Sequence, residues 1–279
     1  MRIDGFTDHF ADVNGIRLHY VVGGQGDPLV LLPGWPRTWW QFHKMMPALS
    51  ERHRVIAVDL RGMGDSDKPD SGYDKKTMAA DIHGLVRSLD LGSVNLAGED
   101  IGAMVAYSLA ANHPEVTRKV ALWEGFHPTE LFNDMRLMPR EGVPNMWWFP
   151  FNHVDQLPED LLAGRFRVLL DWLIEYESDP SAFSEETRSL YATAYDSPAA
   201  IRAGNGWYKT IQQDIEDAAE YPELDIPFLV LGGMYYDFMT AALKGRVKDP
   251  RFVEFQGAGH YLAEERPDDL VRELTSFFE

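Results

Sequence analysis

Cysteine is absent from the sequence, and so is any apolar run long enough to cross a membrane. Without cysteine the chain can form no disulfide bond, no thiolate metal site and no cysteine nucleophile. The N-terminus lacks the apolar core of a secretory signal peptide. These absences favour a cytoplasmic protein that does not act at a membrane.

Positive charge is also scarce. Lysine and arginine number 26 against 44 aspartate and glutamate residues, which leaves a formal net charge of -18. A surface of this sign repels the phosphates of nucleic acids, so a nucleic-acid partner is not expected. With 45% hydrophobic and 12% aromatic residues, the 279-residue chain can bury a large core. Its length fits one large domain, or a core domain that carries an inserted lid.

Short apolar segments alternate along the chain with longer stretches of helical spacing. The sequence predicts strands at 15–22, 29–32, 55–58, 94–97, 119–123, 228–231 and 252–255. It predicts helices at 77–89, with Thr77 as the N-cap, at 103–112 and at 267–278. Alternation of this kind indicates an α/β fold with a mostly parallel sheet and helices on both faces.

The segment from 127 to 221 breaks this alternation. It contains no convincing buried strand, but Trp, Tyr and Leu recur at helical spacings. The segment is long for a connection between neighbouring strands, which favours an inserted helical cap over a longer run of crossover helices. We therefore expect a core domain at 1–126 and 222–279, and a cap, or lid, at 127–221.

The most informative motif is Gly98-Glu99-Asp100-Ile101-Gly102, which lies between a predicted strand and a predicted helix. This is the spacing of a nucleophile elbow, with Asp100 where serine hydrolases carry Ser. Glycines flank such a turn because a Cβ would collide with neighbouring backbone. The alternative is that Asp100 only caps the helix. Other motifs in the sequence favour the nucleophile.

Two further loops follow strand ends. Pro33-Gly34-Trp35-Pro36 places the Trp35 N–H where, with the Ile101 N–H, it would form an oxyanion hole. The Trp35–Pro36 bond is a candidate cis peptide, because only X–Pro bonds adopt cis at low cost. In the second loop, which begins at Asp59, the residues Arg61, Gly62, Gly64 and Ser66 are expected to fix the loop itself and not to touch a substrate.

His260 is the candidate base, since it follows the last predicted strand in Gly257-Ala258-Gly259-His260 and precedes the closing helix. Two acids compete to orient it. Glu124 directly follows the strand at 119–123, and Asp237 lies further along the loop after the strand at 228–231. We favour Glu124, because catalytic side chains are held best at strand ends.

With these motifs the chain resembles the α/β-hydrolase superfamily over essentially its full length. The likeness is greatest to the epoxide hydrolase and haloalkane dehalogenase branch, which uses an Asp nucleophile. The resemblance implies an α/β-hydrolase fold with Asp100 as nucleophile. The family usually has His at the positions of Pro33 and Glu99. We expect the Glu99 side chain to point away from the pocket, because a second unpaired carboxylate would raise a pKa of the pair.

An Asp nucleophile suits attack on an sp³ carbon, since attack on an ester would give a mixed anhydride. The alkyl ester formed on Asp100 would then be hydrolysed by water that His260 activates. Epoxide hydrolases of this kind use a lid tyrosine, and Trp207-Tyr208-Lys209 matches that motif. We therefore expect Tyr208 to protonate the opened epoxide. The indole N–H of Trp147 or Trp148 is the candidate second donor. The alternative is that these tryptophans only line the pocket as apolar side chains.

The expected reaction is conversion of an epoxide to a vicinal diol, with no cofactor and no metal. Haloalkane dehalogenases carry Trp after the nucleophile and fluoroacetate dehalogenases carry Arg, whereas this chain has Ile101. Dehalogenation, a non-hydrolytic isomerase or cyclase, and a ligand-binding protein on the same scaffold are the alternatives. The tryptophans in the candidate pocket segments, Trp207 among them, predict a small-molecule substrate that is bulky and hydrophobic or aromatic. A homodimer is compatible with the sequence.

Overall fold

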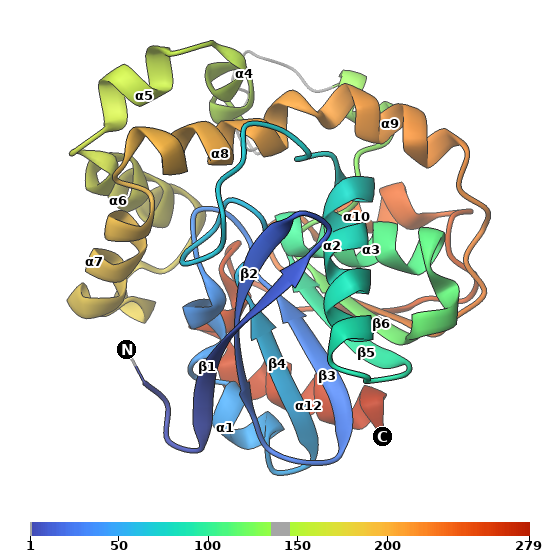
Figure 1. Ribbon diagram of the computed structural model, residues 1–279. Coiled ribbons are helices and arrows are strands. Elements are labelled where there is room, and N and C mark those ends of the chain that lie inside the picture. Colours follow the sequence, from blue (N-terminus) through green and yellow to red (C-terminus); the bar gives the residue numbers. More distant parts are fainter. Residues whose placement is uncertain (1, 135–145) are drawn as a thin grey trace.

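The computed structural model describes residues 2–134 and 146–279. Within them, eight strands form one sheet in the order β1-β2-β4-β3-β5-β6-β7-β8 (Figure 1). β1 and β2 are antiparallel to their neighbours, and all other neighbours in the sheet are parallel. The strands are β1 Phe6–Val13, β2 Ile16–Gly23, β3 Asp27–Leu32, β4 His53–Val58, β5 Val94–Glu99, β6 Thr117–Trp123, β7 Phe228–Gly232 and β8 Arg251–Glu254. The expected mostly parallel sheet is confirmed.

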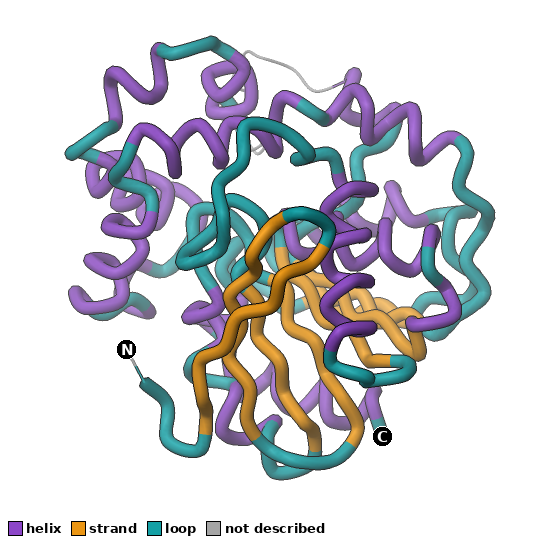
Figure 2. The backbone as a smooth tube through the Cα atoms, viewed as in Figure 1, coloured by secondary structure: helices purple, strands orange, loops and turns teal. Residues whose placement is uncertain are grey.

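Helices cover both faces of this sheet, as Figure 2 shows. Along β3 the buried side chains alternate: Val30 and Leu32 pack with α2 and α3, whereas Leu29 and Leu31 pack with α1, α11 and α12. Strands buried on both faces consist of nearly continuous apolar residues, which is why the sequence shows them clearly. The core helices are α1 Met46–Leu49, α2 Lys75–Ser88, α3 Ile101–Asn112, α10 Tyr236–Leu243, α11 Leu262–Glu265 and α12 Pro267–Phe278.

Two local features differ from the sequence prediction. β1 was not predicted, because most of its side chains are exposed and it lies at the edge of the sheet. The N-cap of α2 is Asp74 and not Thr77: the Asp74 carboxylate accepts the backbone N–H of Thr77 at 2.7 Å. Asp and Thr are both good N-caps, so composition alone could not choose between them.

The long segment between β6 and β7 is helical in its described part, and we name it the cap segment. Figure 1 shows α4, α5 and α8 gathered beyond the upper end of the sheet in that view. Residues 135–145 of the expected cap lie outside the described residues. The helices of the cap segment are α4 Trp148–His153, α5 Leu157–Leu162, α6 Phe166–Glu177, α7 Glu185–Ala194, α8 Pro198–Lys209 and α9 Ile211–Ala219, and short 3-10 turns occur at Glu130–Asp134 and Pro180–Ala182. In the described part of the chain, no helix has the length and apolar character that spanning a membrane requires.

Candidate active site

Asp100 lies in a strained turn between β5 and α3. Its backbone has φ 53° and ψ -119°, a conformation that costs energy for any residue other than glycine. The flanking glycines make the turn possible. A Cβ on Gly98 would lie 2.4 Å from the carbonyl oxygen of Gly102, and a Cβ on Gly102 would lie 2.0 Å from that of Leu32. The predicted elbow is therefore present in the backbone.

The Asp100 carboxylate faces backbone donors on two elements. The Trp35 N–H donates to Oδ2 at 2.9 Å, and the Ile101 N–H also bonds to the carboxylate. The Trp35–Pro36 peptide is cis. Burial raises the pKa of Asp100 to about 6, although the Arg37 charge and these backbone donors oppose the rise. At neutral pH the carboxylate is ionised, the form that can attack carbon.

His260 and Glu124 lie together beside this carboxylate. His260 Nδ1 is 3.5 Å from Glu124 Oε2. Both side chains are buried, and the N–H groups of Gly233 and Tyr235 hold the Glu124 carboxyl. Burial lowers the pKa of His260 and raises the pKa of Glu124, because it disfavours the charged form of each. A neutral imidazole is the form that can accept a proton from water.

The other candidate acid, Asp237, has a different setting. It lies in the first turn of α10 and is exposed to solvent. Glu124 instead directly follows β6 in a backbone conformation with φ 49°, and it lines the same cavity as Asp100 and His260. Of the two candidates, the structure brings only Glu124 to the imidazole.

A narrow cavity lies in front of Asp100. Its volume is about 50 Å³. Asp100, Glu124 and His260 reach it from the sheet, and Tyr208 and Trp148 reach it from the cap segment. Its remaining lining is largely apolar and consists of Trp35, Met104, Gly125, Phe126, Phe132, Met146, Phe149, Glu177 and Tyr235. The structure thus places Tyr208 and one of the two predicted tryptophans, Trp148, in the same cavity as Asp100.

The other predicted tryptophans lie elsewhere. Trp147 packs edge-on against Trp172, with ring centroids 5.3 Å apart, and is not among the lining residues. Trp207 is fully buried, and its indole N–H donates to the carbonyl of Arg61 at 3.2 Å. Trp207 therefore links α8 to the loop after β4. It is not among the residues that line the cavity.

Glu99 points away from the cavity, as expected. Its carboxylate pairs with the fully buried Arg37, with Nη1 2.8 Å from Oε1. Gln41 donates from Nε2 to the same carboxylate at 2.7 Å and accepts the Gly34 N–H through its own Oε1 at 2.9 Å. This network connects the Gly34-Trp35 turn to the turn at Asp100. It involves Glu99, one of the two positions at which the resemblance leads us to expect histidine. Arg37 was not singled out in the sequence, because its partner is adjacent only in the fold.

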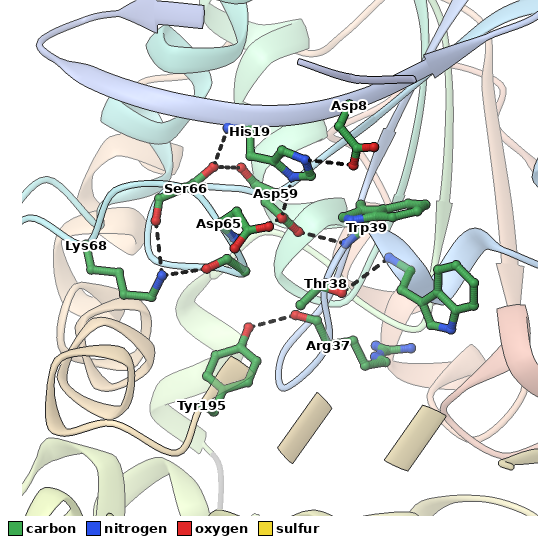
Figure 3. A network of polar contacts seen from close by, with 12 residues as sticks. Asp8, His19, Arg37, Thr38, Trp39, Asp59, Asp65, Ser66, Lys68 and Tyr195 are labelled. Carbon is green, nitrogen blue, oxygen red and sulfur yellow. Dashed lines mark hydrogen bonds and ion pairs between the residues drawn. The ribbon is translucent and has the colours of Figure 1, made fainter. Parts of the chain in front are cut away.

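The loop after β4 is structural, as predicted. Figure 3 shows the Asp59 carboxylate between the His19 imidazole and the Trp39 N–H, at 2.8 and 2.9 Å. The Ser66 hydroxyl donates to the Asp59 carbonyl at 2.6 Å and accepts the His19 N–H at 2.8 Å. Arg61 forms a bidentate pair with Asp81. These contacts join the loop after β4 to β2, to the backbone of Trp39 and to α2, and none of these residues lines the cavity.

Two polar residues of the cavity lining, Tyr235 and Glu177, were missed in the sequence. Tyr235 lies just before α10, and its hydroxyl donates to Glu177 Oε1 at 2.8 Å. Glu177 ends α6 on the same stripe as the buried Phe166, Leu170 and Ile174. The sequence did contain a signal for Glu177: it is an acid at a position where the helical spacing predicts a buried apolar residue.

Comparison with known proteins agrees with this fold. The profile of the alpha/beta hydrolase fold matches residues 27–267. A soluble epoxide hydrolase of Corynebacterium sp. (strain C12) is 33% identical, over 98% of this chain and 97% of the relative. The solved structure of the epoxide hydrolase CorEH superimposes with a TM-score of 0.86 at 31% identity, and the match covers 98% of each chain. A fluoroacetate dehalogenase of Burkholderia sp is 26% identical, over 98% of this chain and 94% of the relative.

Proposed function

This chain belongs to the α/β-hydrolase fold family and is a hydrolase of the epoxide hydrolase-like kind, and we propose that it converts an epoxide to a vicinal diol through an ester of Asp100. The observation that carries the proposal is the ionisable Asp100 carboxylate at the elbow, held by backbone donors inside an apolar cavity. An apolar setting strengthens a carboxylate as a nucleophile because little water solvates it. A nucleophile of this kind needs a substrate with an electrophilic carbon.

In the first step an Asp100 oxygen attacks one epoxide carbon and the C–O bond of the ring breaks. The ring oxygen leaves as an alkoxide and takes the proton of the Tyr208 hydroxyl. Burial raises the pKa of Tyr208 well above its usual value, so the phenol holds its proton until the alkoxide forms. Trp148 is the indole donor available on the same side of the cavity.

In the second step His260 removes a proton from water, and the hydroxide attacks the carbonyl carbon of the Asp100 ester. The Trp35 and Ile101 N–H groups hold the oxyanion that forms on that carbon. The acyl C–O bond then breaks, and the diol oxygen takes the proton from His260. Afterwards the proton of the attacking water that remains on the Asp100 carboxyl passes through water to the Tyr208 phenolate, which restores both groups. Glu124 orients the imidazole and stabilises its protonated form.

The donors in this cavity suit an epoxide substrate better than a haloalkane. Release of a halide needs fixed N–H donors, whereas an alkoxide needs a proton, and Tyr208 can supply one. Ile101 offers only a backbone N–H beside the nucleophile. The epoxide hydrolase relatives support the same choice.

The decisive experiment is a panel of epoxides and haloalkanes with product analysis, followed by one turnover in water enriched in the heavy oxygen isotope. We expect diols from epoxides, no halide release, and isotope in Asp100 with none in the first diol formed. Halide release without diol would transfer the activity to dehalogenation. Isotope found only in the diol would show that water attacks the epoxide directly.

A further inference from the structure

A cluster of metal-ligating side chains lies at the surface, outside the cavity. It consists of His83, His113 and Glu115, and one ligand atom of each residue lies within 4.8 Å of the other two. None of the three residues lines the cavity. His83 belongs to α2, whereas His113 and Glu115 lie directly after α3. The cluster therefore joins two helices that pack side by side on one face of the sheet.

The spacing of the ligand atoms is close to that of a tetrahedral metal site. Nε2 of His83 lies 3.5 Å, and Nδ1 of His113 lies 3.7 Å, from Oε1 of Glu115. Two ligands of one tetrahedral zinc ion, each about 2.0 to 2.1 Å from the metal, lie about 3.4 Å apart. Both nitrogen–oxygen separations therefore match those of bound ligands to within about a few tenths of an ångström.

The two imidazole rings have to turn before they can share one ion. They stack with their centroids 4.0 Å apart and their planes 7° from parallel, so the lone pairs of the two nitrogens run side by side. Solvent reaches the side chains of His83 and His113, which are 28% and 25% exposed, and Glu115 is 61% exposed. Because the core does not enclose these side chains, the rings are able to rotate until both lone pairs point to one ion.

The backbone that carries the second histidine is fixed by hydrogen bonds. The His113 N–H donates to the carbonyl of Leu109 at 2.8 Å, and the His113 carbonyl accepts the Val116 N–H at 3.2 Å. The Thr117 hydroxyl donates to the same carbonyl at 3.2 Å. His113 and Glu115 are thus held close to each other before any ion binds, which lowers the entropy that binding costs.

The ligand types select the class of ion. Imidazole nitrogen is a common ligand of zinc, copper and nickel, whereas magnesium and calcium are bound by oxygen ligands. The chain contains no cysteine, so no thiolate site competes for such an ion. A formal net charge of -18 favours the approach of cations in general.

We propose that His83, His113 and Glu115 form a binding site for one zinc ion, with water as the fourth ligand. The helix α3 has 12 residues and begins at Ile101, so the site lies about 18 Å from the turn at Asp100. The zinc ion is therefore structural: it links α2 to the turn after α3, stabilises the folded chain and takes no part in the reaction at Asp100.

The first test is calorimetric titration of the metal-free protein with Zn²⁺, and with Mg²⁺ for comparison. We expect one zinc ion per chain and no binding of magnesium. His83→Gln and His113→Gln should each weaken zinc binding more than about tenfold, since even residues behind the ligands change metal affinity by that factor. His153→Gln is the matched control, because His153 is an exposed histidine of α4 outside the cluster, and it should bind zinc as the wild type does.

The second test is thermal unfolding, which separates a structural site from a chance contact. Zinc at about 100-fold above its Kd should raise Tm by about 5 °C, because the ion binds the folded chain. His83→Gln should abolish this rise, and without zinc its Tm should stay near that of the wild type because the side chain is partly exposed. No binding of zinc, or binding that persists in both histidine variants, would overturn the site. Binding without a rise in Tm would overturn its structural role.

Discussion

The cavity has two walls that arise in different ways. The sheet wall consists of Trp35, Asp100, Glu124 and His260, which follow β3, β5, β6 and β8. The cap wall consists of Trp148, Glu177 and Tyr208, which project from α4, α6 and α8. Backbone conformation holds the sheet wall, and helix packing holds the cap wall.

The positive φ angles show this difference. Asp100 and Glu124 have φ 53° and 49°, and backbone N–H groups from the loops after β3 and β7 bond to their carboxyls. The cap residues lie in ordinary helices, where a neighbouring side chain fixes them: Tyr208 packs on Trp35 at 5.4 Å and on Phe149 at 4.9 Å. We infer that the sheet wall carries the covalent chemistry, and that the cap wall adjusts ring opening and substrate choice.

The largest expected effect is at His260. His260→Gln should slow hydrolysis of the ester by about 10²- to 10⁴-fold, because no other group in the sheet wall can take the proton from water. Asp100 still attacks the epoxide, so the ester should accumulate and be visible by intact mass. Normal turnover without an adduct would remove His260 from the second step.

The next effect distinguishes the two acids. Glu124→Gln should lower ester hydrolysis by about 10²-fold or more, since the imidazole loses its orienting carboxyl. Asp237→Asn is the matched control and should stay near the wild type, because Asp237 is exposed on α10. Stopped-flow measurement of the second step would show which acid serves. The opposite pattern would assign the role to Asp237.

On the cap wall, Tyr208→Phe should slow ring opening by about 10²-fold, the usual scale for a positioned acid. The second step should be affected much less, because Tyr208 does not take part in it. Burst kinetics of adduct formation measure the first step alone. An unchanged burst would mean that another donor protonates the alkoxide.

The dependence of kcat/KM on pH tests whether a residue of the sheet wall or of the cap wall causes the loss of activity at low pH. Because burial raises the pKa of Asp100 to about 6, its carboxylate becomes protonated as the pH falls, and protonation removes the nucleophile. We expect kcat/KM to fall about tenfold per pH unit well below pH 6. The limb should persist in Tyr208→Phe, since it belongs to the sheet wall. If the low-pH decrease in kcat/KM shifted in Tyr208→Phe, the two walls would not act independently.

The smallest effect compares two adjacent tryptophans. Trp148→Phe should reduce kcat/KM by about 2- to 10-fold, the scale of one lost hydrogen bond. Trp147→Phe should change it less, because Trp147 packs on Trp172 and is not among the cavity residues. Steady-state kinetics on one epoxide suffice. Equal losses would mean that the indoles act through packing.

The sheet and the elbow could be predicted from the sequence because they depend on local chemistry. Buried parallel strands consist of apolar runs, and the turn at Asp100 needs Gly98 and Gly102 on either side. The Trp207-Tyr208-Lys209 motif likewise located Tyr208, although the motif could not show that Trp207 bonds to Arg61 and lies outside the cavity.

What remained open was decided by contacts between residues far apart in the chain. Burial leaves a carboxylate only three outcomes, which are pairing, hydrogen bonding or protonation, and tertiary packing selects among them. The pairing of Glu99 with Arg37 and the placing of Glu177 between Tyr235 and Tyr261 each join separate elements. The fold and the carboxylate after β5 therefore follow from local sequence patterns, whereas contacts between distant residues determine which acids are ion-paired and which line the cavity.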